Sequence, residues 1–241
     1  MKHIIVTFLI ACCLNSTYAF ADEDTIRIST SYKTLLSTPE GTGMLDQVIK
    51  EAFRRIGKKA RIVFTPNERS LIAVNGGMFD GEINRVAGME KDFPNLIQVP
   101  EANMIMLFVA FATKDIIISD WESLRPLRIG IVKGWKILER NTEGFPRITR
   151  VMNADQLFLM LHKERIDVAL YSKILGHEWI KELNCTHVHH LEPPLASQAM
   201  YLYLHKKHED LVTPLAKAIK EMKKDGTYDK IVLETTGFLY Q

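Results

Sequence analysis

The sequence predicts an α/β protein with two lobes, each built on a mainly parallel sheet flanked by helices. Two observations lead to this fold class. Short segments that suit strands alternate with longer segments whose apolar residues recur at helical spacing. This alternation occurs twice, and a long extended segment follows each occurrence, at 103–113 and 198–205. We expect these two segments to be hinge crossings between the lobes.

The first set of elements covers residues 25–85. Polar and apolar residues alternate at 25–30, as in a half-buried strand, and Gly57 follows a helical apolar pattern that it is suited to end. The expected order is strand 25–30, helix 43–57, strand 60–64, helix 66–75, and a strand leading into Glu82 and Arg85. Strands separated by helices in this way are typical of a parallel sheet.

The second set has the same organisation. The expected elements are strand 127–132, a helix from 134, strand 148–152, a helix capped by Asn153, strand 167–171, and a helix capped by Ser172 that runs to 183. After the second crossing, helices are expected at 211–224 and 226–234. The predicted first lobe is therefore 22–113 with 200–241, and the second lobe is 114–199.

The first 21 residues have the pattern of a secretory signal peptide. Lys2 is followed by an apolar run that is too short to span a bilayer, and Ala19 and Ala21 suit a cleavage site after Ala21. A lipoprotein box at 9–12, with lipidation of Cys12, is the alternative; we favour it less because the leader before Cys12 would be very short. We therefore expect a soluble periplasmic protein.

Composition excludes several classes of protein. The chain has 31 basic and 29 acidic residues, a net charge of +2 that falls by one when the leader with Lys2 is removed. This balance gives no electrostatic reason to expect binding to nucleic acid or to an anionic membrane surface. Only Cys185 of the three cysteines lies outside the leader, so no disulfide framework is expected.

Several segments together resemble the periplasmic solute-binding proteins of family 3, the amino acid-binding type with the two-lobed type II fold. The resemblance covers the whole mature chain. The most specific segment is the C-terminal one, in which a helix, Asp-Gly-Thr-Tyr and a second short helix follow one another. The segments that carry the resemblance are 41–57, 69–85, 127–135, 157–171 and 215–232.

The resemblance implies a cleft that closes on a ligand by hinge motion. In this family an arginine of the first lobe holds the ligand carboxylate and an acidic residue of the second lobe holds the amino group. The chain departs from the family at two places. Trp135 stands where Thr or Ser is usual, and Tyr171 and Ser172 follow a strand where the acidic residue is expected.

Position in the predicted sheet suggests further ligand-binding residues. Glu82 and Arg85 lie near the carboxyl end of a strand, the edge at which open α/β sheets bind ligands. We expect Arg85 to clamp a carboxylate and Glu82 to accept from an amine or hydroxyl; a surface ion pair is the alternative. Arg69 is a second candidate anion ligand or a helix-surface residue. Tyr32 and Trp135 are candidate walls of the cleft or core residues.

Other chemistries have weaker sequence support. Cys185, His187 and His189 would share one face of a strand, but no fourth metal ligand is evident, so no metal site and no cofactor are expected. The Gly41–Gly43 segment lacks the lysine and the spacing of a phosphate-binding loop, and the chain has no Gly-x-Ser-x-Gly nucleophile motif.

We therefore expect a monomeric, non-enzymatic binding protein for an inner-membrane ABC-type transporter permease. The expected solute is small and polar and carries a carboxylate, as an amino acid or a related compound does. Two alternatives remain open. One is a lyase or dehydratase on the same scaffold, with Glu82 as general acid. The other is a ligand-sensing partner of a membrane receptor. Tyr171 and Ser172 complete the set of expected ligand-binding residues.

Overall fold

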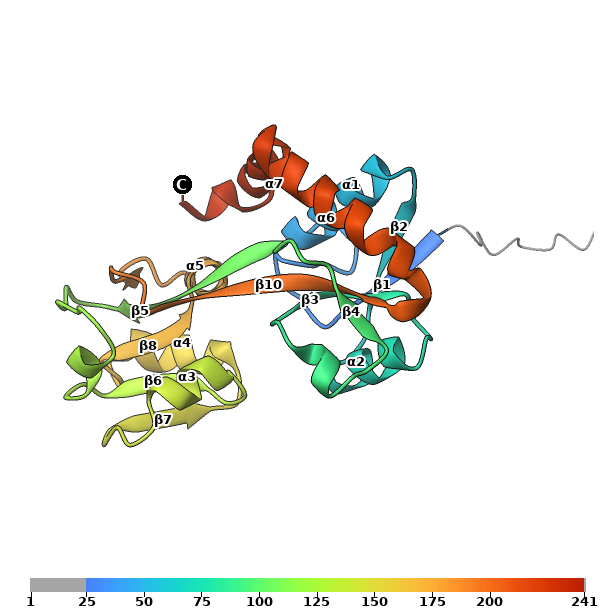
Figure 1. Ribbon diagram of the computed structural model, residues 1–241. Coiled ribbons are helices and arrows are strands. Elements are labelled where there is room, and N and C mark those ends of the chain that lie inside the picture. Colours follow the sequence, from blue (N-terminus) through green and yellow to red (C-terminus); the bar gives the residue numbers. More distant parts are fainter. Residues whose placement is uncertain (1–24, 241) are drawn as a thin grey trace, which may run out of the picture.

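The computed structural model describes residues 25–240, and the predicted signal peptide, its cleavage site and Cys12 lie outside this range. The described residues form one curled sheet of ten strands with seven α-helices around it, and the α/β fold class is confirmed. Figure 1 shows two bodies of strands and helices joined by two long strands. The residue bounds that we assigned to the two lobes stay a prediction.

The first half carries three parallel strands in the order β2-β1-β3. Gly81 of β3 comes so close to β10 that an added Cβ would lie 2.5 Å from the Tyr203 carbonyl oxygen, so only glycine fits there. The elements are β1 (Thr25–Thr30), α1 (Met44–Arg55), β2 (Lys59–Phe64), α2 (Asn67–Asn75), β3 (Gly81–Arg85) and the short β4 (Leu96–Gln98).

The second half repeats this arrangement in the order β8-β6-β7, again with parallel pairing. Its α3 is only six residues long, much shorter than its neighbours. The elements are β6 (Ile129–Val132), α3 (Lys136–Asn141), β7 (Ile148–Val151), α4 (Ala154–His162), β8 (Val168–Ser172), α5 (Lys173–Glu182) and the two-residue β9 (His189–His190).

Two long antiparallel strands join the halves. β5 (Met104–Ala112) and β10 (Ala196–His205) pair with each other, and each also pairs with a strand of one half: β10 with β3, and β5 with β8. Figure 1 shows them running side by side from one body to the other. They occupy the two segments that we expected to be crossings, and the sheet is continuous through them.

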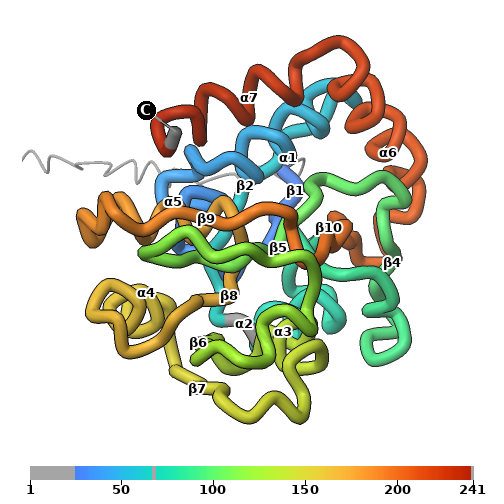
Figure 2. Tube along the Cα trace, turned by 90° about the vertical axis from the view of Figure 1, so that its left-hand side faces the viewer, coloured from blue at the N-terminus to red at the C-terminus, as the bar shows by residue number. Residues whose placement is uncertain are grey.

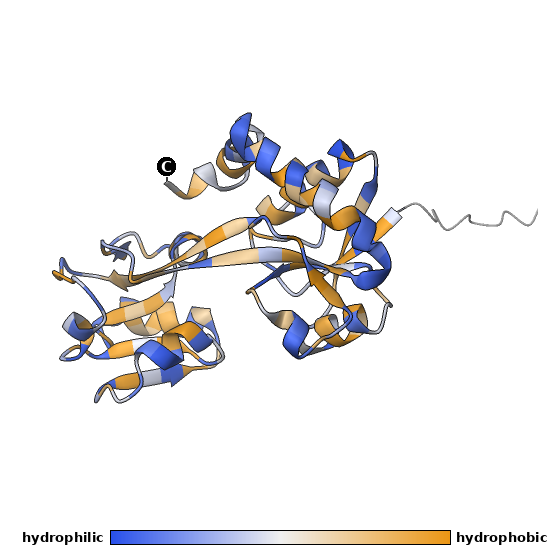
Figure 3. Ribbon diagram, viewed as in Figure 1, coloured by the Kyte–Doolittle hydropathy of each residue, from blue (hydrophilic) through white to orange (hydrophobic). Residues whose placement is uncertain are grey.

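Each half has an apolar core beside its parallel strands. In the first half α1 buries one apolar face that includes Phe53, against the sheet and the C-terminal helices. In the second half Phe111 of β5 and Phe158 of α4 are fully buried in edge-to-face contact. Figure 3 shows hydrophobic residues concentrated in the strands of both halves and alternating with hydrophilic ones along α6.

The C-terminal helices return to the first half and then reach toward the second. α6 (Glu209–Lys224) and α7 (Thr227–Thr236) pack against α1, as Figure 2 shows. The last turn, η4 (Gly237–Tyr240), lies near α5, where the Lys181 ammonium donates to the Phe238 carbonyl at 2.9 Å and lies 4.8 Å from the Phe238 ring centroid. The C-terminal segment thus contacts both halves.

Most predicted elements are confirmed within two residues at each end, but the segment 185–190 is not the strand that we considered. Only His189 and His190 are in a strand, and Cys185 is buried beyond the end of α5. The sequence also gave no sign of β4, whose three residues are too few for a periodic pattern. Among residues 25–240, no helix has the length and apolar character that crossing a membrane requires.

Candidate functional site

Most of the expected site residues lie at or just beyond the carboxyl ends of the parallel strands of both halves, but Glu82 is the second residue of β3. In the first half Tyr32 follows β1, and Glu82 and Arg85 belong to β3. In the second half Trp135 follows β6, and Tyr171 and Ser172 end β8. Open α/β sheets place their ligands at this edge because the loops and helix starts converge there.

Glu82, the second residue of β3, and Arg85, the last, form an ion pair. The Arg85 Nη2 atom lies 2.8 Å from Glu82 Oε1, and the Ser70 hydroxyl donates to Glu82 Oε2. Glu82 is fully buried, and burial raises its pKa, while Arg85 and Ser70 act in the opposite direction. In the structure the Glu82 carboxylate contacts Ser70 and Arg85, and its role as an acceptor for a ligand amine or hydroxyl stays a prediction.

The Arg85 side chain is 16% exposed and lies near the loop that follows β1. Its Nη2 atom is 3.4 Å from the Ser31 hydroxyl oxygen, and its charge lowers the pKa of the neighbouring Tyr32, which burial raises by a larger amount. A guanidinium in this position can hold a carboxylate through paired hydrogen bonds. The role of Arg85 as an anion ligand stays a prediction.

Asn84 belongs to the same cluster, and from the sequence we assigned it no ligand-binding role. Its Nδ2 atom donates to the Tyr32 hydroxyl at 3.2 Å and lies 3.5 Å from the Met104 sulfur. Its Oδ1 atom is buried and has no hydrogen-bond partner within the described part of the chain. An alternating strand puts Asn84 on the same face as Glu82, which is the signal that could have identified it.

The second half contributes an aromatic cluster. The Trp135 ring lies 4.9 Å from Tyr171 and 5.4 Å from Phe108 of β5, measured between centroids, and Phe158 packs edge-on against Tyr171. Trp135 is half-buried, while Tyr171 is 7% exposed. The structure brings Trp135 and Tyr171 together, and the partly open Trp135 leaves one aromatic surface that a ligand could reach.

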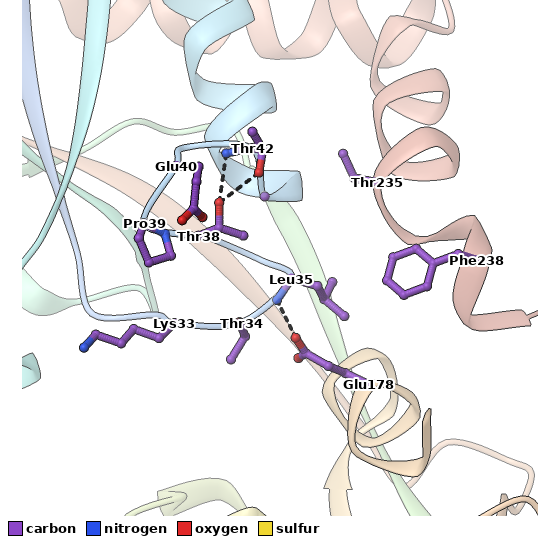
Figure 4. Close-up of a pocket in the computed structure, with 11 residues that line it drawn as sticks. Lys33, Thr34, Leu35, Thr38, Pro39, Glu40, Thr42, Glu178, Thr235 and Phe238 are labelled. Carbon is purple, nitrogen blue, oxygen red and sulfur yellow. Dashed lines mark hydrogen bonds between the residues drawn. The ribbon is translucent and has the colours of Figure 1, made fainter. Parts of the chain in front are cut away.

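The halves approach each other at this edge. The Leu35 N–H of the first half donates to Glu178 Oε1 of α5 at 2.6 Å, and a pocket of about 440 Å³ lies beside this contact (Figure 4). None of the expected site residues lines this pocket. Burial raises the pKa of Tyr171, and electrostatic interactions with Glu178 and with Tyr32 of the opposite half raise it further. Tyr32 and Tyr171 are therefore close enough to interact electrostatically across the two halves.

Glu178 makes the stability of the protein depend on pH. Burial, with a smaller contribution from Glu182, raises its pKa to about 7, above the ordinary 4.5 of a glutamate. The folded state therefore binds this proton more tightly than the unfolded state, and the stability that Glu178 contributes below pH 4.5 is lost as the pH rises through 7.

We expect Glu178→Gln to reduce the fall in unfolding free energy between pH 5 and pH 8, since a glutamine stays neutral and can still accept from Leu35. Urea unfolding at both pH values measures this difference. Glu40→Gln, in the same pocket but exposed, is the matched control. An equal fall in wild type and Glu178→Gln would contradict the prediction.

Arg69 and Ser172 lie apart from the contacts described above. Arg69 is exposed on the first turn of α2, and no described contact joins it to Glu82 or Arg85. Ser172 precedes α5 as expected, but its hydroxyl makes no capping bond and, within residues 25–240, has no hydrogen-bond partner. That hydroxyl is fully buried, so a ligand hydrogen bond to it stays a prediction.

The histidine-rich segment does not form a metal centre of three ligands among the described residues. His177 Nε2 and His190 Nδ1 lie 3.0 Å apart, and His190 Nε2 is 3.1 Å from Glu192. Burial lowers the pKa of His177 to about 4, with further contributions from His190 and Lys173. Burial also lowers the pKa of His190, with Glu192 acting in the opposite direction, and the two rings are linked by a hydrogen bond.

Comparison with known proteins adds to this geometry. No protein-family model matches the chain. A curated, uncharacterized protein of Shewanella oneidensis is 25% identical over 197 residues, which make up 76% of this chain and 72% of that protein. This relative leaves the function open.

Solved structures share the fold. Two structures of the ancestral protein AncCDT-1 superpose with TM-scores of 0.72 and 0.66, at 20% and 19% identity. Each match covers 89% of this chain and 96% of the other chain. AncCDT-1 is described in one case as a cationic amino acid solute-binding protein, and in the other as an amino acid-binding precursor of cyclohexadienyl dehydratase.

Two further structures match as well. The substrate-binding protein of an amino acid ABC transporter has a TM-score of 0.63 at 18% identity, over 87% of this chain and 98% of that one. A histidine kinase sensor domain with similarity to periplasmic binding proteins has a TM-score of 0.68 at 16% identity, over 88% and 96%. At these identities the likeness concerns architecture. The chain has the type II periplasmic binding-protein fold.

Proposed function

We propose that this protein binds a small polar solute through a carboxylate or similar anion, and delivers it to an ABC-type permease after export to the periplasm as a monomer. The observation that carries the proposal is the position of Arg85. Its guanidinium lies at the carboxyl end of β3 and interacts electrostatically with Tyr32, which in turn interacts with Tyr171 of the other half. In related folds this edge receives the ligand.

The remaining expected residues suit the same role. Tyr32 and Trp135 supply aromatic surface from opposite halves, and the buried Asn84 Oδ1 and Ser172 Oγ atoms could accept from ligand donors. Arg69 is a second candidate for the anion. The second half offers Tyr171 and Ser172 in place of the acidic residue that holds an amino group in family 3, so we propose an acid whose amino group, if present, is held differently.

A thermal-shift screen of the chain from residue 22 tests this proposal. The candidate ligands are amino acids, small organic acids and polyamines. A ligand at a hundred times its dissociation constant should raise the unfolding free energy by about 2.7 kcal/mol. The double variant Glu82→Gln/Arg85→Met should lose the shift produced by acids, and Arg61→Ala, an exposed arginine on β2, should keep it. An undiminished shift in the double variant would remove Arg85 from the site.

The same samples separate binding from catalysis. A bound acid that mass spectrometry recovers unchanged supports a carrier, whereas conversion to a product supports the lyase alternative. The second candidate function is ligand sensing for a membrane receptor, which the shared fold of the histidine kinase sensor domain favours. Co-purification of the loaded protein with a permease or with a receptor distinguishes these two.

A further inference from the structure

A chain of buried polar groups leads to Arg85 from the interior of the first half. Ser29 of β1, Ser70 of α2 and Glu82 of β3 are each fully buried. The Ser29 and Ser70 hydroxyl oxygens lie 2.7 Å apart, Ser70 donates to Glu82 Oε2, and Glu82 Oε1 meets Arg85 Nη2. Three separate elements thus contribute to one continuous network that ends at the candidate anion-binding residue.

The direction of the hydrogen bonds in this network follows from the number of protons available. A hydroxyl has one proton to donate, and Ser70 gives its proton to the carboxylate. Ser29 must therefore donate to Ser70. Both oxygens of the carboxylate are then held, one by a hydroxyl and one by the guanidinium, so Glu82 has little freedom to rotate.

The strand pairing of β3 also restrains the backbone of Glu82. Glu82 is paired with Ser29 in the register of β1 and β3, and with Tyr203 of β10 on its other side, so its Cα is held between two strands. Arg85, three residues later, is at the end of β3, where a long side chain would otherwise move freely. An arginine held by a fixed carboxylate loses less conformational entropy when it binds a ligand.

We infer that Glu82, supported by Ser70 and Ser29, is a positioning residue that orients the Arg85 guanidinium and does not itself contact the ligand. The inference rests on the proposed role of Arg85 as the anion ligand, but the orientation of Arg85 is a property of the protein without ligand. It assigns a function to a fully buried carboxylate that no ligand could reach without displacing Ser70 or Arg85.

Nitrogen-15 NMR of the arginine side chains tests the inference without any ligand. A guanidinium that is held gives separate signals for its two Nη groups, whereas one that rotates freely gives a single averaged signal. We expect separate Arg85 signals in the wild type, assigned by their loss in Arg85→Lys, and one averaged signal in Glu82→Gln. Ser70→Ala removes a single hydroxyl and should broaden the two signals toward each other.

Two controls isolate the effect. Asp46→Asn neutralises another fully buried carboxylate of the first half, one that binds Ser37, Thr38 and Gly43, and it should leave the Arg85 signals unchanged. Glu51→Gln removes the carboxylate that pairs with Arg54 and Arg55, and it should change only the side-chain signals of these two arginines.

Unchanged, separate Arg85 signals in Glu82→Gln would overturn the inference. If Glu82→Gln fails to fold, unchanged signals in Ser70→Ala would overturn it equally. The outcome is distinguishable from failure of the proposed function: Arg85 signals that average in Glu82→Gln, with no acid giving a thermal shift in the wild type, would support the positioning role and reject acid binding.

Discussion

Arg85→Ala is expected to lower the unfolding free energy by about 3–5 kcal/mol at neutral pH, which is the usual cost of removing one partner of a buried ion pair. The reason is Glu82, which is fully buried and would lose the counter-ion of its carboxylate. Burial already raises the pKa of Glu82, and the loss of Arg85 would raise it further. The folded variant would therefore take up a proton, and its deficit in stability should shrink as the pH falls toward 4.5.

Urea unfolding at pH 5 and pH 8 measures this effect, and Glu82→Gln/Arg85→Met is its control. The double variant removes both charges and keeps similar volume, so it should recover most of the lost free energy, because replacing a buried pair by neutral groups is often close to neutral. An Arg85→Ala protein as stable as wild type at pH 8 would show that Glu82 is not a buried charge.

Phe158→Ala is expected to destabilise the protein by about 3–5 kcal/mol, as is usual when a buried phenylalanine is truncated. Phe158 is fully buried on α4, with its ring 5.2 Å from Phe111 and 5.9 Å from Tyr171. The cavity would lie directly behind Tyr171, so the variant should also bind an acid less tightly. Urea unfolding and the thermal shift measure the two effects.

Leu159→Ala is the matched control, since Leu159 is the next residue on the same helix and is 39% exposed. It should change the unfolding free energy by much less than Phe158→Ala, because it leaves no buried cavity. Equal losses in the two variants would mean that α4 packs through a different face.

The fold was predictable because its signals are local. The strand 25–30 and the helix 44–55 each carry a periodicity that can be read within about a dozen residues, and Gly43 and Gly57 flank the helix. The cap at Ser172 shows the limit of such signals. The helix starts where the serine indicates, but the serine hydroxyl makes no hydrogen bond to the backbone N–H groups. Side-chain rotamers depend on tertiary packing, which a local pattern does not specify.

The candidate site was predictable only in part. The positions of Arg85, Trp135 and Tyr171 at or beside strand ends could be read from the sequence, and their roles as ligand-binding residues stay predictions. The contacts around these positions join distant residues: Ser29 reaches Ser70 across 41 positions, and Leu35 reaches Glu178 across 143. A single serine in a strand or a glutamate in a helix has no neighbouring sequence pattern that distinguishes it from other serines and glutamates. Such pairings become visible only once the sheet register is known.

The antiparallel pairing of β5 and β10 has a genetic consequence. Everything between these strands forms one uninterrupted stretch of sequence, and its two ends are adjacent in space, where Phe108 is opposite Ala196. The corresponding stretch of another protein could replace this one at the two junctions, because the hydrogen bonds between β5 and β10 would still align its ends. Chimeras that exchange this stretch among proteins of the same architecture should therefore assemble, and they offer a route by which one half could acquire new ligand preferences while the other is retained.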